Sequence, residues 1–259
     1  MLYFFKELHT RNTSLFYFGL GCFIFSMICL VAARYSNKKV FNVNAWYKPF
    51  KFAFSTFLYT WAMAWYCHYL VNFNIELFNW ANILLLGFEI LYIALQASRG
   101  QLSHYNNSTP LYATLYSMMA IAASLVSIYA TYVGVLFFKH AIPSLPSYYL
   151  WSIRLSILLF VVFSFQGFTM GARLNHSVGA INDNSNRFII GWSKTVGDLR
   201  VAHFIGMHTL QVLPFLSYYV FNSTIATFLL ALLYGALALS SLIQALKGRP
   251  VSIKLKHAK

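Results

Sequence analysis

Long apolar runs alternate with short polar stretches along most of the chain. A helix that crosses the hydrocarbon core of a bilayer needs about 20 predominantly apolar residues. Seven runs come close to that length, over residues 15–33, 50–71, 78–96, 111–138, 148–170, 201–221 and 224–246. The pattern predicts an all-α polytopic membrane protein, in which residues 1–259 form a single transmembrane domain built as a seven-helix bundle.

The composition agrees with a membrane location. Of the 259 residues, 59% are hydrophobic and 9% are charged, and the mean hydropathy is +0.60. A soluble domain has about 25% charged residues. The first apolar run is too long for the core of a cleaved signal peptide and lacks an A-x-A site. Cys22, Cys29 and Cys67 fall inside predicted spans, which indicates apolar packing and neither a disulfide framework nor a zinc site.

The basic residues follow the alternation of the loops. When alternate loops are assigned to opposite sides, fifteen Lys and Arg residues fall on one side and three on the other. The larger set is Arg34, Lys38, Lys39, Lys48, Lys51, Arg99, Arg173, Arg187, Lys194, Arg200, Lys247, Arg249, Lys254, Lys256 and Lys259; the smaller is Lys6, Arg11 and Lys139. By the positive-inside rule we expect an N-terminus outside and a C-terminus in the cytoplasm, across a bacterial inner membrane.

The same distribution bears on partners. A net charge of +14 spread over loops forms no nucleic-acid-binding motif, so we expect no nucleic-acid partner. The expected partner is the lipid bilayer. A membrane-protein partner or a second copy of the chain remains open, as does a lipid-soluble or anionic small-molecule ligand.

The sixth run carries the densest polar pattern. On a helical wheel, one arc of about 140° gathers most of its polar residues. That arc holds Arg200, His203, Phe204, Met207, His208, Gln211 and Pro214. Ionisable groups that face lipid are costly, so this stripe must face protein or enclosed water. Asp198 stands just before it.

Two further runs have one-sided polar stripes. Glu89 lies within the third predicted span, and Tyr92, Gln96, Arg99 and Ser103 share its arc of about 80°. In the fifth run and its extension, a similar arc holds Gln166, Thr169, Arg173 and His176. A shared cytoplasmic-side cavity would accommodate all three stripes. Glu89 and His208 reach similar depths, so we expect direct or one-water contact between them.

These stripes supply the candidate site residues. Candidates for catalysis are Glu89, Asp198, His203 and His208. Candidates for binding a substrate or anion are Lys48, Lys51, Gln96, Arg99, Arg173, Trp192, Arg200 and Gln211. For Lys48 and Lys51, the other interpretation is a pair of lysines that extend to acidic lipid headgroups beside an aromatic packing face.

Histidines and carboxylates admit several chemistries. Imidazole suits zinc and iron, and haem b needs axial histidines, so the candidate ligands are His104, His176, His203 and His208. His203 and His208 are five residues apart, unlike the i,i+4 pair of helix-borne zinc sites. The sequence favours a metal- or haem-dependent membrane enzyme or redox protein acting on a lipid-soluble or small anionic substrate. A proton-coupled transporter or channel, or a structural subunit of a membrane complex, is the alternative.

Three stretches carry a resemblance to known proteins. AWYKPFKF, LQASRGQLSHYN and GDLRVAHFIGMHTLQVLP together resemble a family of bacterial multi-pass inner-membrane proteins that has no assigned activity. The resemblance implies location and topology. A more distant similarity is to the alkaline ceramidases and adipoQ-type receptors, which are seven-span zinc proteins. Their H-x-x-x-H pair is absent here, and His203 and His208 do not replace it.

Overall fold

The computed structural model describes residues 2–179 and 191–251, and most of them are helical. In chain order the elements are α1 (Leu2–Arg11), α2 (Thr13–Tyr35), β1 (Lys39–Val40), β2 (Val43–Asn44), α3 (Tyr47–Cys67), α4 (Ile75–Arg99), α5 (Pro110–Lys139), α6 (Ser147–Phe165), α7 (Gly167–Arg173), β3 (Ser177–Val178), β4 (Gly197–Asp198), α8 (Arg200–Met207), α9 (Thr209–Leu216), the π-helix η1 (Ser217–Phe221) and α10 (Thr224–Leu246). Within the described residues, extended backbone is limited to two antiparallel pairs, β1 with β2 and β3 with β4. The all-α prediction is confirmed.

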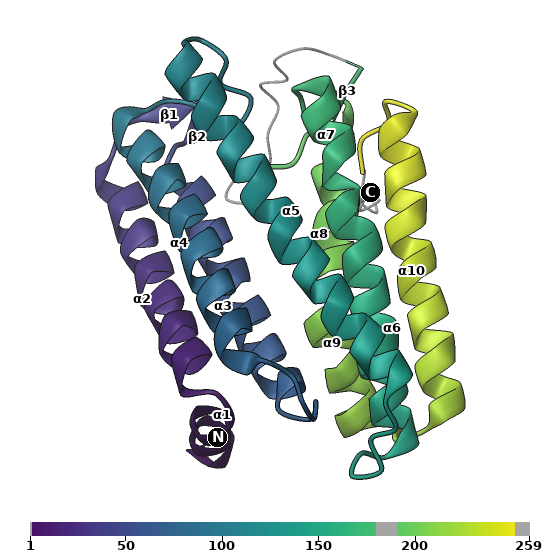
Figure 1. Ribbon diagram of the computed structural model, residues 1–259. Helices are drawn as coiled ribbons and strands as arrows, with labels where there is room; N and C mark the ends of the chain where they lie inside the picture. Colours follow the sequence, from purple (N-terminus) through teal and green to yellow (C-terminus); the bar gives the residue numbers. More distant parts are fainter. Residues whose placement is uncertain (1, 180–190, 252–259) are drawn as a thin grey trace.

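The long helices lie side by side with alternating directions (Figure 1). Helix α3 packs against α2, α4 and α9, whereas α6 packs against α5, α8, α9 and α10. One end of the bundle therefore collects the C-terminal ends of α2, α4, α7 and α10 and the N-terminal ends of α3, α5 and α8. Both short sheets lie at this end (Figure 1).

The helices support several membrane crossings. Five segments are long and apolar enough to span a bilayer: Thr13–Tyr35, Ile75–Arg99, Pro110–Lys139, Ser147–Arg173 and Thr224–Leu246. A sixth span results if Arg200–Met207 and Thr209–Phe221, bent by 43°, are counted together. Helix α3 is not among these candidates, because lysine, hydroxyl and tyrosine side chains dilute its apolar character. The prediction of a multi-pass membrane protein is confirmed, with five or six candidate spans in the described residues where the sequence predicted seven.

Side-chain caps define where several helices begin. The side-chain oxygen Oδ1 of Asn12 accepts a hydrogen bond from the backbone N–H of Leu15, and that of Asn74 from the backbone N–H of Leu77, at 3.0 Å in each case. Thr109 caps α5 in the same way at 3.2 Å, with Pro110 as the first helical residue. Helix α4 ends at Gly100, which adopts the left-handed conformation (φ 68°) that glycine tolerates best. These local signals place α4 and α5 independently of the surrounding packing.

The broken span α8–α9 leaves backbone carbonyls without helical partners, and side chains occupy them. Pro214 lacks an N–H, so it cannot donate to the carbonyl of Leu210 four residues earlier. The hydroxyl of Tyr66, from α3, donates to that carbonyl instead. Near the bend, the hydroxyl of Tyr234 donates to the carbonyl of Ile205 at 2.9 Å. In a bilayer, where water cannot satisfy freed carbonyls, such partners make a broken helix tolerable.

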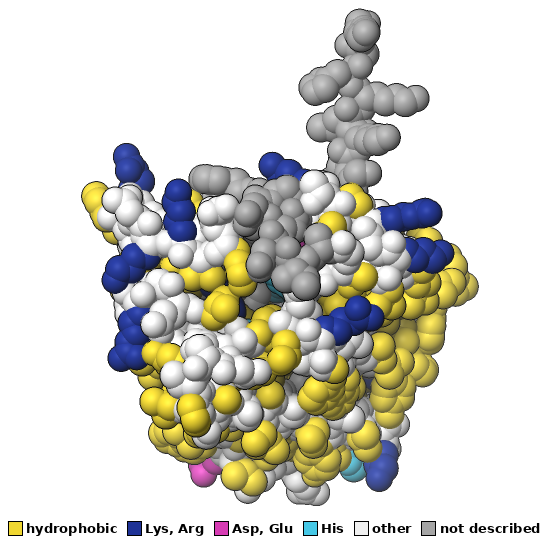
Figure 2. All heavy atoms as spheres, turned by 90° about the horizontal axis from the view of Figure 1, so that it is seen from above, with side chains coloured by type: hydrophobic (Ala, Val, Ile, Leu, Met, Phe, Trp, Pro, Cys, Tyr) yellow, Lys and Arg dark blue, Asp and Glu magenta, His cyan; other side chains and the backbone are white. Residues whose placement is uncertain are grey.

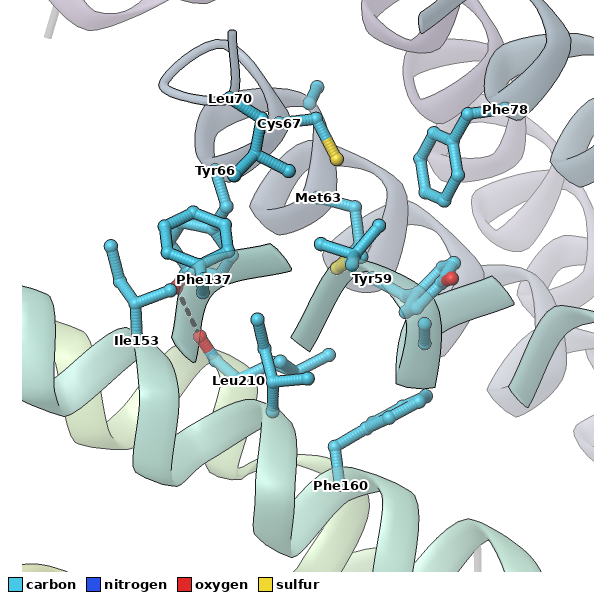
Figure 3. Close-up of a cluster of buried hydrophobic side chains, with 14 of the residues drawn as sticks. Tyr59, Met63, Tyr66, Cys67, Leu70, Phe78, Phe137, Ile153, Phe160 and Leu210 are labelled. Carbon is cyan, nitrogen blue, oxygen red and sulfur yellow. Dashed lines mark hydrogen bonds between the residues drawn. The ribbon is translucent and has the colours of Figure 1, made fainter. Parts of the chain in front are cut away.

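The main hydrophobic core lies between α3, α5, α6 and α9 (Figure 3). Tyr59 of α3 stacks on Phe160 of α6 with ring centroids 5.5 Å apart. Helix α8 approaches α6 closely enough that a Cβ added to Gly206 would lie 2.1 Å from the Cβ of Phe163. Glycine is therefore required at position 206, and this contact fixes the depth of His203 and His208 relative to α6.

Candidate functional site

Lysine and arginine side chains surround the end of the bundle that carries the two sheets, as Figure 2 shows. We call this the basic end. Among the described residues it carries Arg34, Lys38, Lys39, Lys48, Lys51, Arg99, Arg173, Lys194, Arg200, Lys247 and Arg249. The clustering at one end agrees with the alternation of the loops in the sequence.

At the basic end, Asp198 and Arg200 form an ion pair. Oδ1 of Asp198 accepts hydrogen bonds from the backbone N–H of Arg200 at 3.1 Å and from its Nε at 2.9 Å. Oδ2 accepts from the backbone N–H of Ser193 at 2.9 Å and from Nη2 of Arg200 at 2.6 Å. Nη2 also donates to the carbonyl of Gly191 at 2.5 Å. Asp198 is only 1% exposed. Its hydrogen bonds to Ser193 and Arg200 connect residues 191–197 to the start of α8.

Lys48 and Lys51, from the first turn of α3, lie beside this ion pair. A Cβ placed on Gly191 would be 3.5 Å from Nζ of Lys51, so Lys51 and Arg200 reach the same residue from two helices. Lys48 is half-buried and lies three residues before Lys51, so the two lysines share the first turn of the helix. The three basic side chains are thus held within electrostatic reach of one another.

Two histidines complete the cluster from neighbouring loops. Burial, followed by the charge of Arg200, lowers the pKa of His176 to about 4, while Asp198 opposes this shift. Burial and the charge of Lys48 hold the pKa of His104 well below its usual value. Burial alone would raise the pKa of Asp198, but the hydrogen bonds and charge of Arg200 bring it below its usual range. At neutral pH both imidazoles are neutral, and the positive charge resides on lysine and arginine.

A second polar feature lies in the interior of the bundle, along α4. Asn82, Glu89 and Gln96 are spaced by seven residues, so they fall on one stripe of the helix, roughly 10 Å apart. They are 1%, 3% and 0% exposed, respectively. Asn82 donates to the carbonyl of Phe78 at 2.8 Å, and Gln96 donates to the hydroxyl of Tyr92 at 2.9 Å. Within the described residues, Oδ1 of Asn82, Oε1 of Glu89 and Oε1 of Gln96 have no hydrogen-bond partner.

His208 lies at the bend between α8 and α9 and has polar neighbours on both ring nitrogens. Its Nε2 is 3.3 Å from the hydroxyl of Ser55 in α3, and its Nδ1 is 3.2 Å from Oε1 of Gln211. Because Oε1 of the amide can only accept, Nδ1 carries the proton and Nε2 accepts from the serine. Both nitrogens are thereby occupied by residues of α3 and α9.

The expected contact between Glu89 and His208 is wrong in its direct form. Among the described residues no hydrogen bond or ion pair joins the two side chains; Ser55 and Gln211 take the histidine instead. The helices also differ in their neighbours, since α4 packs against α2, α3 and α5, whereas α8 and α9 pack mainly against α6 and α10. A polar stripe on each of two helices does not determine which third helix lies beside them.

The histidines do not come together as a metal site. In residues 2–179 and 191–251, no group of three or more His, Cys, Asp or Glu side chains is arranged to hold a metal ion. His203 donates from Nδ1 to the carbonyl of Phe163 at 2.7 Å, at the junction of α6 and α7. The predicted ligand set of His104, His176, His203 and His208 is therefore divided between the basic end and the helix interior.

The remaining predicted binding residues have different surroundings. Arg99 and Arg173 are exposed at the ends of α4 and α7. Trp192 is half-buried, and its ring packs edge-on against Phe204 with centroids 5.7 Å apart. The predicted cavity shared by three polar stripes also differs from the hollow found between α6 and α10, which apolar residues such as Leu159 line.

Two residues that matter for these sites, Ser55 and Asn82, are not among the candidates predicted from the sequence. Ser55 supplies a hydroxyl to His208 from a helix distant in sequence. Asn82 extends the stripe of Glu89 and Gln96 by one further step of seven residues. The seven-residue spacing was available in the sequence and could have identified Asn82, whereas the contact of Ser55 depends on helix packing.

Comparison of the chain with protein-family models, with curated proteins and with solved structures finds no match.

Proposed function

We propose that this chain is a proton-coupled transporter or channel of seven transmembrane helices, in which Glu89 binds and releases the proton. The observation that carries the proposal is the stripe of Asn82, Glu89 and Gln96 on α4, each deeply buried and each with an unpartnered oxygen. The stripe extends over roughly 21 Å of a membrane-length helix, most of the roughly 30 Å hydrocarbon core of a bilayer.

The cost of these groups supports a functional use. Leaving one buried acceptor without a hydrogen bond costs about 1–3 kcal/mol. Three such acceptors in a row, one of them on a carboxyl group, would be expensive to retain for packing alone. Polar and ionisable residues inside membrane spans commonly line ion or proton pathways.

The acid and the two amides of the stripe would have different roles in a proton pathway. Only Glu89 can change its protonation state, so it is the group that takes up a proton as a carboxylic acid and gives it up again as a carboxylate. Asn82 and Gln96 cannot titrate, but their amides can hold bridging water on either side of the acid. The proton would enter from one end of α4 and leave at the other.

The topology that we propose has the N-terminus outside and the basic end in the cytoplasm. Helix α3 would be the seventh span, since it has 21 residues and lies among α2, α4 and α9. There its polar side chains face protein and avoid lipid. The cluster of lysines and arginines at the basic end supports this orientation through the positive-inside rule.

The metal- or haem-dependent enzyme expected from the sequence has less support. A metal requires several ligands to meet at one point, and no group of three or more such ligands does so in the described residues. Of the candidate axial histidines, His208 contacts Ser55 and Gln211, and His203 donates to the carbonyl of Phe163. The proton-pathway alternative needs no such assembly.

The test is proton flux in liposomes. The full-length protein, reconstituted into vesicles that contain a pH-sensitive dye, is driven by a potassium gradient with valinomycin. We expect the wild type to acidify or alkalinise the lumen faster than protein-free vesicles, and Glu89→Gln to lose about tenfold or more of that rate. Glu76→Gln is the matched control, because Glu76 is exposed in the first turn of the same helix.

Two outcomes would overturn the proposal. One is a wild-type flux equal to that of protein-free vesicles under both polarities of the gradient. The other is an undiminished flux in Glu89→Gln protein that is shown to be inserted in equal amount.

A further inference from the structure

Several features of the basic end are left unexplained by a proton pathway. Helix α3 contributes two lysines, the start of α8 contributes an arginine, and the loops after α4 and α7 contribute two histidines that are neutral at pH 7. Two of these side chains lie close to Gly191, where Nη2 of Arg200 donates to the carbonyl and Nζ of Lys51 would be 3.5 Å from an added Cβ.

Counting the described residues alone, the positive charge of this cluster exceeds its negative charge. Lys48, Lys51 and Arg200 are all half-buried, and Asp198 is the one carboxylate within reach among the described residues. Asp198 is already committed, since it accepts four hydrogen bonds and pairs with Arg200 through two of them. Close like charges disfavour one another, so the cluster is stabilised by any anion that enters it.

The available donors suit an oxyanion with several acceptor oxygens. None of the hydrogen bonds among the described residues uses Nη1 of Arg200, which carries two N–H groups. Within the same part of the chain Lys48 has no hydrogen bond or ion pair. A phosphate group carries roughly −1.5 to −2 charges near pH 7 and has three strongly accepting oxygens. Guanidinium and ammonium groups are its usual protein partners.

We propose that Lys48, Lys51 and Arg200 form a binding site for a phosphate group at the basic end of the bundle. The phosphate would lie between the first turn of α3 and the start of α8. Asp198 would act as a positioning residue, because it holds the guanidinium of Arg200 through Nε and Nη2 and leaves Nη1 without a partner among the described residues. The same chemistry fits a lipid phosphate headgroup and a soluble phosphate, and the experiment separates them.

Binding is measured on the full-length protein in an uncharged detergent at constant ionic strength. The probes are inorganic phosphate, dihexanoyl phosphatidic acid and, as a headgroup of no net charge, dihexanoyl phosphatidylcholine. The readouts are the Tm and the dissociation constant from calorimetry. The variants are Lys48→Gln and Lys51→Gln, with Lys39→Gln as the matched control because Lys39 is an exposed cation in β1 at the same end.

Wild-type protein and Lys39→Gln should bind a phosphate probe. Lys48→Gln and Lys51→Gln should each weaken that binding by about tenfold or more, which is the loss expected for one charge-assisted hydrogen bond. Without probe, Lys48→Gln should be at least as stable as the wild type, since it removes one of several like charges. A response to inorganic phosphate assigns the site to a soluble ligand, and a response to phosphatidic acid alone assigns it to a headgroup. The proposal is overturned if neither inorganic phosphate nor phosphatidic acid binds the wild type. It is also overturned if Lys39→Gln loses as much affinity as the two α3 variants. Because the wild-type measurement stands alone, a variant that fails to fold does not leave the proposal untested.

Discussion

Replacing Asp198 by Asn tests how the loop of residues 191–197 is fixed to the bundle. The carboxylate is 1% exposed and accepts four hydrogen bonds, two of them from the guanidinium of Arg200. Removing one partner of a fully buried ion pair costs about 3–5 kcal/mol. The side chain of Arg200 is 30% exposed, so water recovers part of this loss, and we expect about 2–3 kcal/mol. For a chain of this size, that corresponds to a Tm lower by about 5–10 °C.

The assay is thermal unfolding in detergent, followed by tryptophan fluorescence, with Glu76→Gln as an exposed acidic control. The double variant Asp198→Asn, Arg200→Gln should regain part of the lost stability, because it also removes the cation that would otherwise be left unpaired. The folded-state pKa of Asp198 lies below its unfolded value, so its contribution is present above about pH 4 and is lost as the pH falls further. A single variant within about 0.5 kcal/mol of the wild type would refute the structural role given to this carboxylate.

Three further predictions concern stability. Gly206→Ala should lower the free energy of unfolding by about 1–3 kcal/mol, because its Cβ would overlap Phe163; a Tm equal to that of the wild type would contradict the close packing of α8 on α6. The pKa of His176 is lowered to about 4 by burial and the charge of Arg200. The unfolded chain therefore binds this proton first, and stability should fall as the pH drops from about 6.5. His176→Gln should make unfolding measured between pH 7 and pH 5 less dependent on pH; an unchanged dependence would count against the shift. Asn79→Ala should cost about 1–3 kcal/mol in a denaturant titration, because Asn12 and Asn79 exchange two buried hydrogen bonds; an effect below about 0.5 kcal/mol would contradict it.

The helical pattern could be predicted because the hydrocarbon core of a bilayer requires helices of about 20 predominantly apolar residues. Six of the predicted runs correspond to segments that pass as spans in the described residues, one of them only as a bent pair. The exception is α3, whose lysines and hydroxyl groups lower its hydropathy. Its surroundings of α2, α4 and α9 could not be read from the chain, because packing between helices distant in sequence depends on tertiary contacts.

The candidate site could be predicted only in part. The ionisable residues of the sixth run were correctly placed against protein, since Arg200, His203 and His208 all make polar contacts there. Their partners were not predictable, because Ser55 and the carbonyl of Phe163 come from other helices. A helical wheel gives the direction of a side chain around its own axis, and it carries no information about which helix is found in that direction.

The proposal that Glu89 carries a proton is tested most directly by infrared spectroscopy of the reconstituted protein during a pH titration. The account predicts a carbonyl band of a protonated, buried carboxyl group that disappears as the pH is raised. That band should be absent from Glu89→Gln and unchanged in Glu76→Gln, and its titration should follow the pH dependence of proton flux. A spectrum in which Glu89→Gln and the wild type show the same carboxyl bands at every pH would contradict the account.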